Sequence, residues 1–243
     1  MKSARKTRVH LGQKPISYPL EIIDLCKSFN TTAVIHHLSL SVRQGEVVGI
    51  LGPKGTGKTT LFELISGKAS PTSGMIKVMG KDLQNDNKCA QRQLGAVSTL
   101  QREVNTLGEK HTAREHLQFQ VELLGVSFLK YPEWINAALE VVGLAPYDNL
   151  RIQAFSSGMK RRLAFARALV HNPSLLVIDE PTSGLASQEH QIIWDLVHFL
   201  RSTGKALVLM TSSWEEAIAE CDRVILLSEW LLSERKVEYA GWS

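Results

Sequence analysis

The stretch at 47–60 constrains the fold more than any other part of the chain. An apolar run at 47–51 predicts a buried strand, and the pattern Gly-x-x-x-x-Gly-Lys-Thr follows directly at 52–59. Residues 61–65 then predict a helix that stops at Gly67. A strand, a glycine-rich loop and a helix in this order are the context in which such a loop binds phosphates. The sequence therefore predicts a P-loop and a bound nucleoside triphosphate.

The roles of the loop residues follow from phosphate chemistry. Glycines let the backbone turn tightly, so that successive N–H groups and the helix N-terminus face the phosphates. Lys58 is placed to reach the β- and γ-phosphates, and the Thr59 hydroxyl to hold Mg²⁺. We expect the whole loop to bind the nucleotide, through Gly52, Pro53, Lys54, Gly55, Thr56, Gly57, Lys58, Thr59 and Thr60.

A second apolar run, at 175–178, ends in two adjacent carboxylates, Asp179 and Glu180. At the C-terminal end of a parallel strand, Asp179 is placed to coordinate Mg²⁺. Glu180 is placed to act as the general base that polarises the attacking water. Together with the P-loop, this pair predicts a site that binds ATP and Mg²⁺ and hydrolyses the nucleotide.

The remaining strand patterns predict an α/β fold with two sheets. Alternating apolar and polar residues at 20–25 and 37–42, and an edge-like strand at 75–80, predict an antiparallel sheet near the P-loop. Buried strands at 206–210 and 224–227, separated by helices, continue the pattern of a parallel sheet. We therefore predict a RecA-like parallel-sheet core with an antiparallel β subdomain.

A helical subdomain is predicted at about 89–153, extending through a further helix to 170. Thr112 and Glu115 form a capping-box pattern, and Ser156 or Ser157 offers an N-cap for the last helix. This subdomain is inserted into a single domain that we place at 20–243. At that length, one domain can bury a substantial core.

Residues 1–19 form a basic N-terminal tail, with five lysines and arginines before the first acidic residue, Glu21. We expect the tail to be disordered; a contact with anionic lipid and a targeting peptide are the alternatives. The net charge of +4 is too small to indicate nucleic acid as a partner. No apolar run approaches the roughly 18 residues of a membrane helix, so we expect any membrane role to come through a partner. Three scattered cysteines fit a reducing compartment.

Residues 155–163, Phe-Ser-Ser-Gly-Met-Lys-Arg-Arg-Leu, resemble the signature motif of the ATP-binding-cassette (ABC) ATPases in a variant form. The resemblance covers about residues 20–230 and includes Glu-Pro-Thr-Ser-Gly-Leu at 180–185. It implies a head-to-tail dimer of ABC ATPase subunits, with the signature helix of one facing the ATP of the other. The signature residues implied in that contact are Ser156, Ser157, Gly158 and Met159. The resemblance also implies that Phe29 stacks on the adenine.

Three positions depart from the family pattern. Ala186 stands where the family has an aspartate, and Ser212 stands where it has a histidine that contacts the γ-phosphate. The family also has a glutamine that joins the helical subdomain to the site and approaches the metal. In this chain either Thr99 stands at that position and the glutamine is absent, or Gln101 supplies it. A lost γ-phosphate contact typically costs on the order of 10²–10⁴ in rate.

The departures leave three interpretations open. The chain pairs with a different, better-equipped ATPase subunit; or it forms a homodimer that hydrolyses slowly or by a variant arrangement; or it binds ATP as an adaptor or regulator with little turnover. Lys58, Asp179 and Glu180 are all retained, so we expect ATP binding under each interpretation.

The resemblance implies the ATPase subunit of a membrane transporter that acts with separate membrane-spanning subunits. Such a subunit is cytoplasmic and peripheral, held at the inner face of the membrane by its partner. The signature followed by basic residues resembles those of exporters of polysaccharides and of lipid-linked or heme-type cargo, which favours export. The alternative is a soluble ABC ATPase without transport, with a role in assembly or regulation.

Overall fold

The computed structural model describes residues 18–98, 110–125 and 131–227. Most of the predicted basic tail, at 1–17, lies outside the described residues, as do both Thr99 and Gln101. The question of which of these two occupies the glutamine position therefore stays a prediction.

A five-stranded parallel sheet forms the core of the fold, in the order β6-β7-β8-β3-β9. Its strands are β3 (Val47–Leu51), β6 (Leu94–Val97), β7 (Leu175–Asp179), β8 (Ala206–Thr211) and β9 (Arg223–Leu226). Every residue of β3, β7 and β8 is buried, as expected of strands that are covered on both faces. The predicted parallel-sheet core is confirmed.

Strand β6 corrects one sequence prediction. The sequence predicts a helical region from about residue 89, but the short helix α2 (Asn87–Gln91) lies there, and β6, which follows it, pairs with β7. A four-residue apolar run carries too little periodicity to distinguish a strand from a helix. Gly95 fits this place because a Cβ on it would lie 2.5 Å from the Ala168 carbonyl oxygen. The strand is therefore packed closely against the helix that carries the signature.

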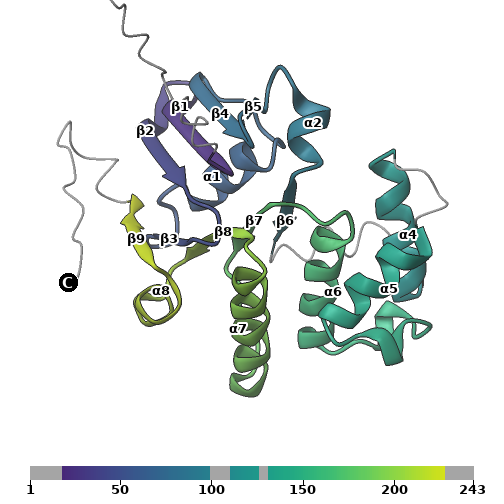
Figure 1. Ribbon diagram of the computed structural model, residues 1–243. Helices are drawn as coiled ribbons and strands as arrows, with labels where there is room; N and C mark the ends of the chain where they lie inside the picture. The colour runs from purple at the N-terminus through teal and green to yellow at the C-terminus, as the bar shows by residue number, and fades with distance from the viewer. Residues whose placement is uncertain (1–17, 99–109, 126–130, 228–243) are drawn as a thin grey trace, which may run out of the picture.

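The second sheet is antiparallel, in the order β2-β1-β4-β5. Its strands are β1 (Leu20–Phe29), β2 (Thr32–Val42), β4 (Ser73–Val78) and β5 (Lys81–Asp82). Helix α1 (Lys58–Ile65) lies between the two sheets, and its Leu61, Phe62 and Leu64 are buried. The predicted antiparallel subdomain is confirmed (Figure 1).

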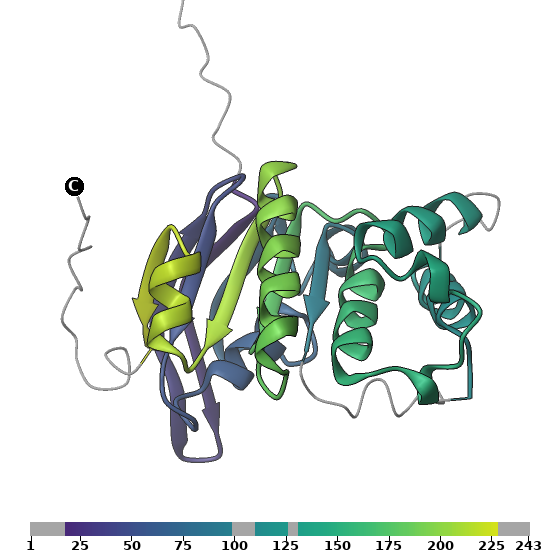
Figure 2. The ribbon, with the colours of Figure 1, turned by 90° about the horizontal axis from the view of Figure 1, so that it is seen from below.

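The helices gather at the opposite end of the molecule and over the parallel sheet (Figures 1 and 2). They are α4 (Ala113–Leu123), α5 (Tyr131–Val141), α6 (Ser157–Leu169), α7 (Ser187–Ser202) and α8 (Trp214–Glu220), with short 3₁₀ turns at Ala145–Tyr147 and Ile152–Ala154. The capping box at Thr112 and Glu115 is present at the start of α4.

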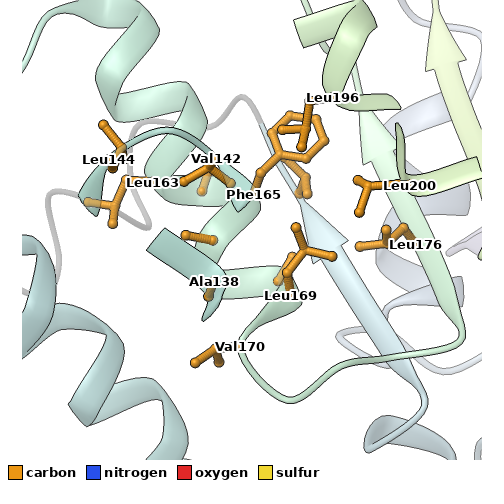
Figure 3. Packing of buried hydrophobic residues seen from close by; sticks show 14 of the residues in the cluster. Ala138, Val142, Leu144, Leu163, Phe165, Leu169, Val170, Leu176, Leu196 and Leu200 are labelled. Atoms are coloured by element: carbon orange, nitrogen blue, oxygen red, sulfur yellow. The ribbon is translucent and has the colours of Figure 1, made fainter. Parts of the chain in front are cut away.

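Alternate residues of the central strands belong to different clusters of the core. In β7, Leu175 and Val177 pack on the side of α1, whereas Leu176 and Ile178 pack on the side of α6 and α7. Figure 3 shows the second cluster, in which the ring of Phe165 from α6 lies beside Leu196 of α7, and which also contains Leu169, Leu176 and Leu200. This packing fixes α6 against the sheet that carries the candidate site.

Within the described residues, no helix combines the length and the apolar composition that crossing a membrane requires.

Candidate functional site

Three neighbouring strands end at the edge of the sheet where the sequence places its motifs. The P-loop follows β3, the carboxylate pair closes β7, and Ser212 follows β8. The Gly52 N–H donates to the Thr211 carbonyl at 3.3 Å, and the Glu180 N–H to the Met210 carbonyl at 2.7 Å. The carboxyl ends of parallel strands are where α/β sheets bind ligands.

The P-loop leaves the start of α1 available to an anion. Gly57 is the N-cap, with φ 92°, and no side chain of the described residues caps this helix end. The first N–H groups of a helix lack intrahelical acceptors, so here they are free for phosphate oxygens. Gly55, with φ 89°, gives the loop a second left-handed turn. These features fit a triphosphate.

The Lys58 side chain joins the P-loop to the carboxylates. It is buried, and its Nζ donates to the Gly52 carbonyl at 2.5 Å and the Pro53 carbonyl at 3.1 Å. The same Nζ lies 3.7 Å from Glu180 Oε1. One ammonium thus contacts both predicted motifs, so the structure brings together the residues predicted to bind the phosphates and to activate water.

Asp179 is electrostatically unusual. Its side chain is buried, and this burial, followed by the negative charge of Glu180, raises its pKa to about 6, although Lys58 and Arg161 oppose the rise. A carboxylate in this setting gains from a nearby cation. Thr59 lies exposed in the first turn of α1. One carboxylate and one hydroxyl fit Mg²⁺, which keeps waters and phosphate oxygens as its other ligands.

In the part of the chain that the structure describes, no cluster of three or more acidic, histidine or cysteine side chains that could hold a metal ion occurs.

Phe29 lies at the exposed end of the β1–β2 hairpin, with 49% of its surface accessible. Lys27 Nζ lies 4.8 Å from the centre of the Phe29 ring. The hairpin approaches the P-loop, since a Cβ on Gly57 would lie 2.9 Å from Val34 Cγ1. An accessible aromatic on this hairpin fits the predicted adenine contact.

Ser212 is exposed between β8 and α8. Its neighbour Ser213 is engaged as the N-cap of α8, because its Oγ accepts from the Glu216 N–H at 3.2 Å. Ser213 is thus committed to the start of α8, and the assignment of Ser212 to the histidine position stays a prediction.

The signature lies at the N-terminus of α6, where Ser156 caps the helix by accepting from the Met159 N–H at 3.1 Å. The Glu189 carboxylate of α7 also sits there, accepting from the Gly158 N–H at 3.1 Å and from both serine hydroxyls at 3.3 Å. A Cβ on Gly158 would lie 2.0 Å from Glu189 Oε1, so a larger residue at this position would require the Glu189 side chain to move. These donors therefore bind an anion of the chain itself, which a phosphate would have to displace.

Sequence reasoning missed several residues that hold the site together. Arg161 of α6 donates to the backbone of the turn after β7. The Glu216 carboxylate accepts from the Thr182 hydroxyl and, at 3.1 Å, from the Thr211 hydroxyl. Glu189 and Arg161 gave no local signal, because their partners lie on other elements.

The sequence family described as ABC transporter matches residues 35–183. Nod factor export ATP-binding protein I of Rhizobium sp. (strain N33) is 36% identical over 208 residues, which cover 86% of this chain and 67% of that protein. The protein of the same name from Bradyrhizobium diazoefficiens is 35% identical over 208 residues, with coverages of 86% and 67%. The chain spans 61% to 67% of the length of such relatives.

Solved structures agree on the fold. An ATP-binding subunit of an ABC transporter superposes with a TM-score of 0.71 at 25% identity, covering 86% of both chains. The cbiO1 protein of Clostridium perfringens, part of the ABC transporter complex cbiONQ, gives a TM-score of 0.74 at 24% identity, covering 86% of this chain and 84% of that one. By its sequence family, its relatives and its fold, the chain belongs to the ABC transporters and is a nucleotide-binding domain of that family.

Proposed function

We propose that this chain hydrolyses ATP to drive an exporter, paired with a second ABC ATPase subunit and bound at the cytoplasmic face of a separate membrane subunit. The observation that carries the proposal is the Lys58 ammonium, which lies between the P-loop carbonyls and Glu180. Export is supported by the relatives, which are named as Nod factor export ATP-binding proteins. This similarity does not assign a Nod factor as the cargo of this chain.

The proposed chemistry uses the groups that meet at the sheet edge. The free N–H groups at the start of α1 bind the phosphates, and Lys58 turns from its loop carbonyls toward the β- and γ-phosphates. Glu180 accepts the proton of the attacking water. Mg²⁺, held by Thr59 and Asp179, would neutralise the charge that develops on the phosphate oxygens.

Two groups of residues complete the nucleotide contacts in this proposal. Phe29 stacks on the adenine, while the remaining loop residues enclose the phosphates. The signature donors, Ser156 to Met159, reach the γ-phosphate held by the facing subunit. This role is supported by the Glu189 carboxylate that Ser156, Ser157 and Gly158 already bind. Dimer closure would then sandwich two nucleotides.

The helical subdomain is the proposed contact with the membrane subunit. We place it at α4, α5 and α6, within one ATPase domain that starts at residue 20. Packing of α6 against α4 and α5 would let dimer closure move these helices as a unit, and the packing of α6 against β6 connects them to the sheet. Gln101, if it reaches the metal, would connect the two parts.

Substitution of Ser212 by histidine tests whether the missing imidazole limits the rate. We expect the turnover of Ser212→His to rise by about tenfold or more, because a histidine can reach a γ-phosphate that serine is too short to contact. The measurement is steady-state ATPase activity of the purified chain. Ser202→His, at the far end of α7, is the control. Equal turnover in Ser212→His and the wild type would show that another residue limits hydrolysis.

Fractionation of intact source cells separates the transporter subunit from the alternative, a soluble ABC ATPase with an assembly or regulatory role. A transporter subunit is expected to sediment with membranes and to be released only when detergent solubilises the membrane subunit that holds it. Recovery of the whole pool in the supernatant would contradict the exporter and favour the alternative. A peripheral protein held only by charge would instead be released by high salt without detergent.

A further inference from the structure

Arg161 connects the signature helix to the turn that carries Glu180. It lies in α6, within the signature-like stretch and just after Met159, and its side chain is buried with 9% accessible. Its Nη1 donates to the Glu180 carbonyl at 2.8 Å, and its Nη2 donates to the Ser183 carbonyl at 3.0 Å. The planar guanidinium therefore holds both ends of one short turn.

This turn needs support from its surroundings. Glu180 has φ 48°, a left-handed conformation that is unfavourable for a residue with a side chain. Such a conformation persists only where neighbouring contacts fix it. The Glu180 carbonyl accepts from the Ser183 N–H at 3.3 Å as well as from Arg161, so the guanidinium reinforces the contact that closes the turn.

Burying the charged Arg161 side chain costs free energy unless the guanidinium makes favourable contacts that depend on its charge. Burial disfavours the charged form and lowers the pKa of Arg161, while Asp179 and Glu180 favour that form. An apolar side chain of similar volume would fill the same space without desolvating a cation. A buried guanidinium that donates to two carbonyls is thus suited to fixing the direction in which the Glu180 side chain leaves the backbone.

We infer that Arg161 is a positioning residue for Glu180 and couples the orientation of the signature helix to that carboxylate. The inference deepens the proposed function and depends on it. In the proposed dimer, the N-terminus of α6 contacts the nucleotide of the partner, while Glu180 serves the nucleotide of its own subunit. Arg161 therefore joins the two sites through one continuous helix of 13 residues.

Arg162 provides a matched control on the same helix. Its Nη1 donates to the Val142 carbonyl at 3.2 Å and the Gly143 carbonyl at 3.1 Å, after the end of α5. It makes the same kind of contact as Arg161, but to the helical subdomain and not to the turn after β7. Substitution of Arg162 should thus cause the loss of stability and activity that follows from removing any arginine of α6 with such contacts.

The first experiment compares Arg161→Met, Arg161→Lys and Arg162→Met by kcat and by ATP affinity measured without turnover. We expect kcat of Arg161→Met to fall by about 10- to 100-fold, since small misplacements of a reacting group have effects of this size. ATP affinity should stay within about threefold, because Arg161 does not contact the P-loop. Arg161→Lys should recover part of kcat, as its ammonium can reach one carbonyl. Arg162→Met should keep kcat within about threefold of the wild type.

The second experiment measures hydrogen exchange of the backbone amides at 180–186, with and without a non-hydrolysable ATP analogue. Exchange at Ser183 is expected to be faster in Arg161→Met than in Arg162→Met, and any protection gained from the analogue to be lost only in Arg161→Met. Melting temperatures of all variants identify general destabilisation. If Arg161→Met fails to fold, Arg161→Lys takes its place in both comparisons.

Unchanged kcat and unchanged exchange in the Arg161 variants would overturn the inference, as would equal losses in the Arg161 and Arg162 variants. A wild-type chain without turnover would contradict the hydrolysis proposed above. The exchange experiment would still decide whether Arg161 fixes the turn and transmits nucleotide binding to it.

Discussion

Glu180→Gln is expected to lower ATP turnover by about 10²–10⁴-fold while ATP still binds. The amide has the same shape as the carboxylate, but it cannot accept the proton of the attacking water. Glu180 lies beside the Lys58 ammonium, 3.7 Å from its Nζ, at the edge where the P-loop begins. The substitution therefore removes the proposed base without removing any of the loop residues.

Binding should persist for an electrostatic reason as well. The negative charge of Glu180 is the second cause, after burial, of the raised pKa of Asp179. Replacing this charge by a neutral amide lowers the pKa of Asp179, so more of the carboxylate is ionised at neutral pH and available to Mg²⁺. We expect the variant with ATP and Mg²⁺ to accumulate as a closed dimer, since the step that reopens it is blocked.

The measurements are steady-state turnover and light scattering with ATP, with ATP and EDTA, and without nucleotide. Glu122→Gln, an exposed glutamate of α4, is the matched control and should behave as the wild type. Turnover retained in Glu180→Gln would assign the general base to another group. A variant that is inactive but remains monomeric with ATP would indicate that a different ATPase subunit completes the dimer.

The parts of the fold that sequence predicted well are those that local pattern determines. The strand at 47–51 and the capping box at Thr112 follow from adjacent residues, and both have the expected bounds or contacts. Strand β6 was missed because its four residues take their structure from β7 and from the close approach of Gly95 to Ala168. Tertiary contact, not local preference, decides that segment.

The same distinction between local pattern and tertiary contact applies to the candidate site. The P-loop and the carboxylate pair each have a sequence pattern, whereas their proximity depends on the sheet order that places β3 and β7 on either side of β8. The partners of Arg161 and Glu189 lie on other elements. Arg161 contacts the Ser183 carbonyl, 22 residues away in the sequence, and Glu189 contacts the Gly158 N–H, 31 residues away. Such pairs leave no periodic signal in a single sequence, so only the fold reveals them.

Lys58→Ala is expected to reduce ATP affinity by about 100-fold or more and to abolish measurable turnover. A hydrogen bond to a charged group contributes about 1.5–3 kcal/mol, and Lys58 is proposed to reach two phosphates. The substitution also removes a cation that lowers the pKa of Asp179, so Mg²⁺ meets a carboxylate that is protonated more often. Both effects weaken the binding of the Mg²⁺–ATP complex.

Stability must be separated from binding in this variant, because Lys58 is buried and donates to the Gly52 and Pro53 carbonyls. Thermal melting without nucleotide reports the loss of these contacts, whereas calorimetry with ATP and Mg²⁺ reports affinity. Lys81→Ala, an exposed lysine of β5, controls for net charge and should bind ATP normally. Since the remaining loop N–H groups cannot replace an ammonium, a folded Lys58→Ala with wild-type affinity would show that the nucleotide does not bind at this loop.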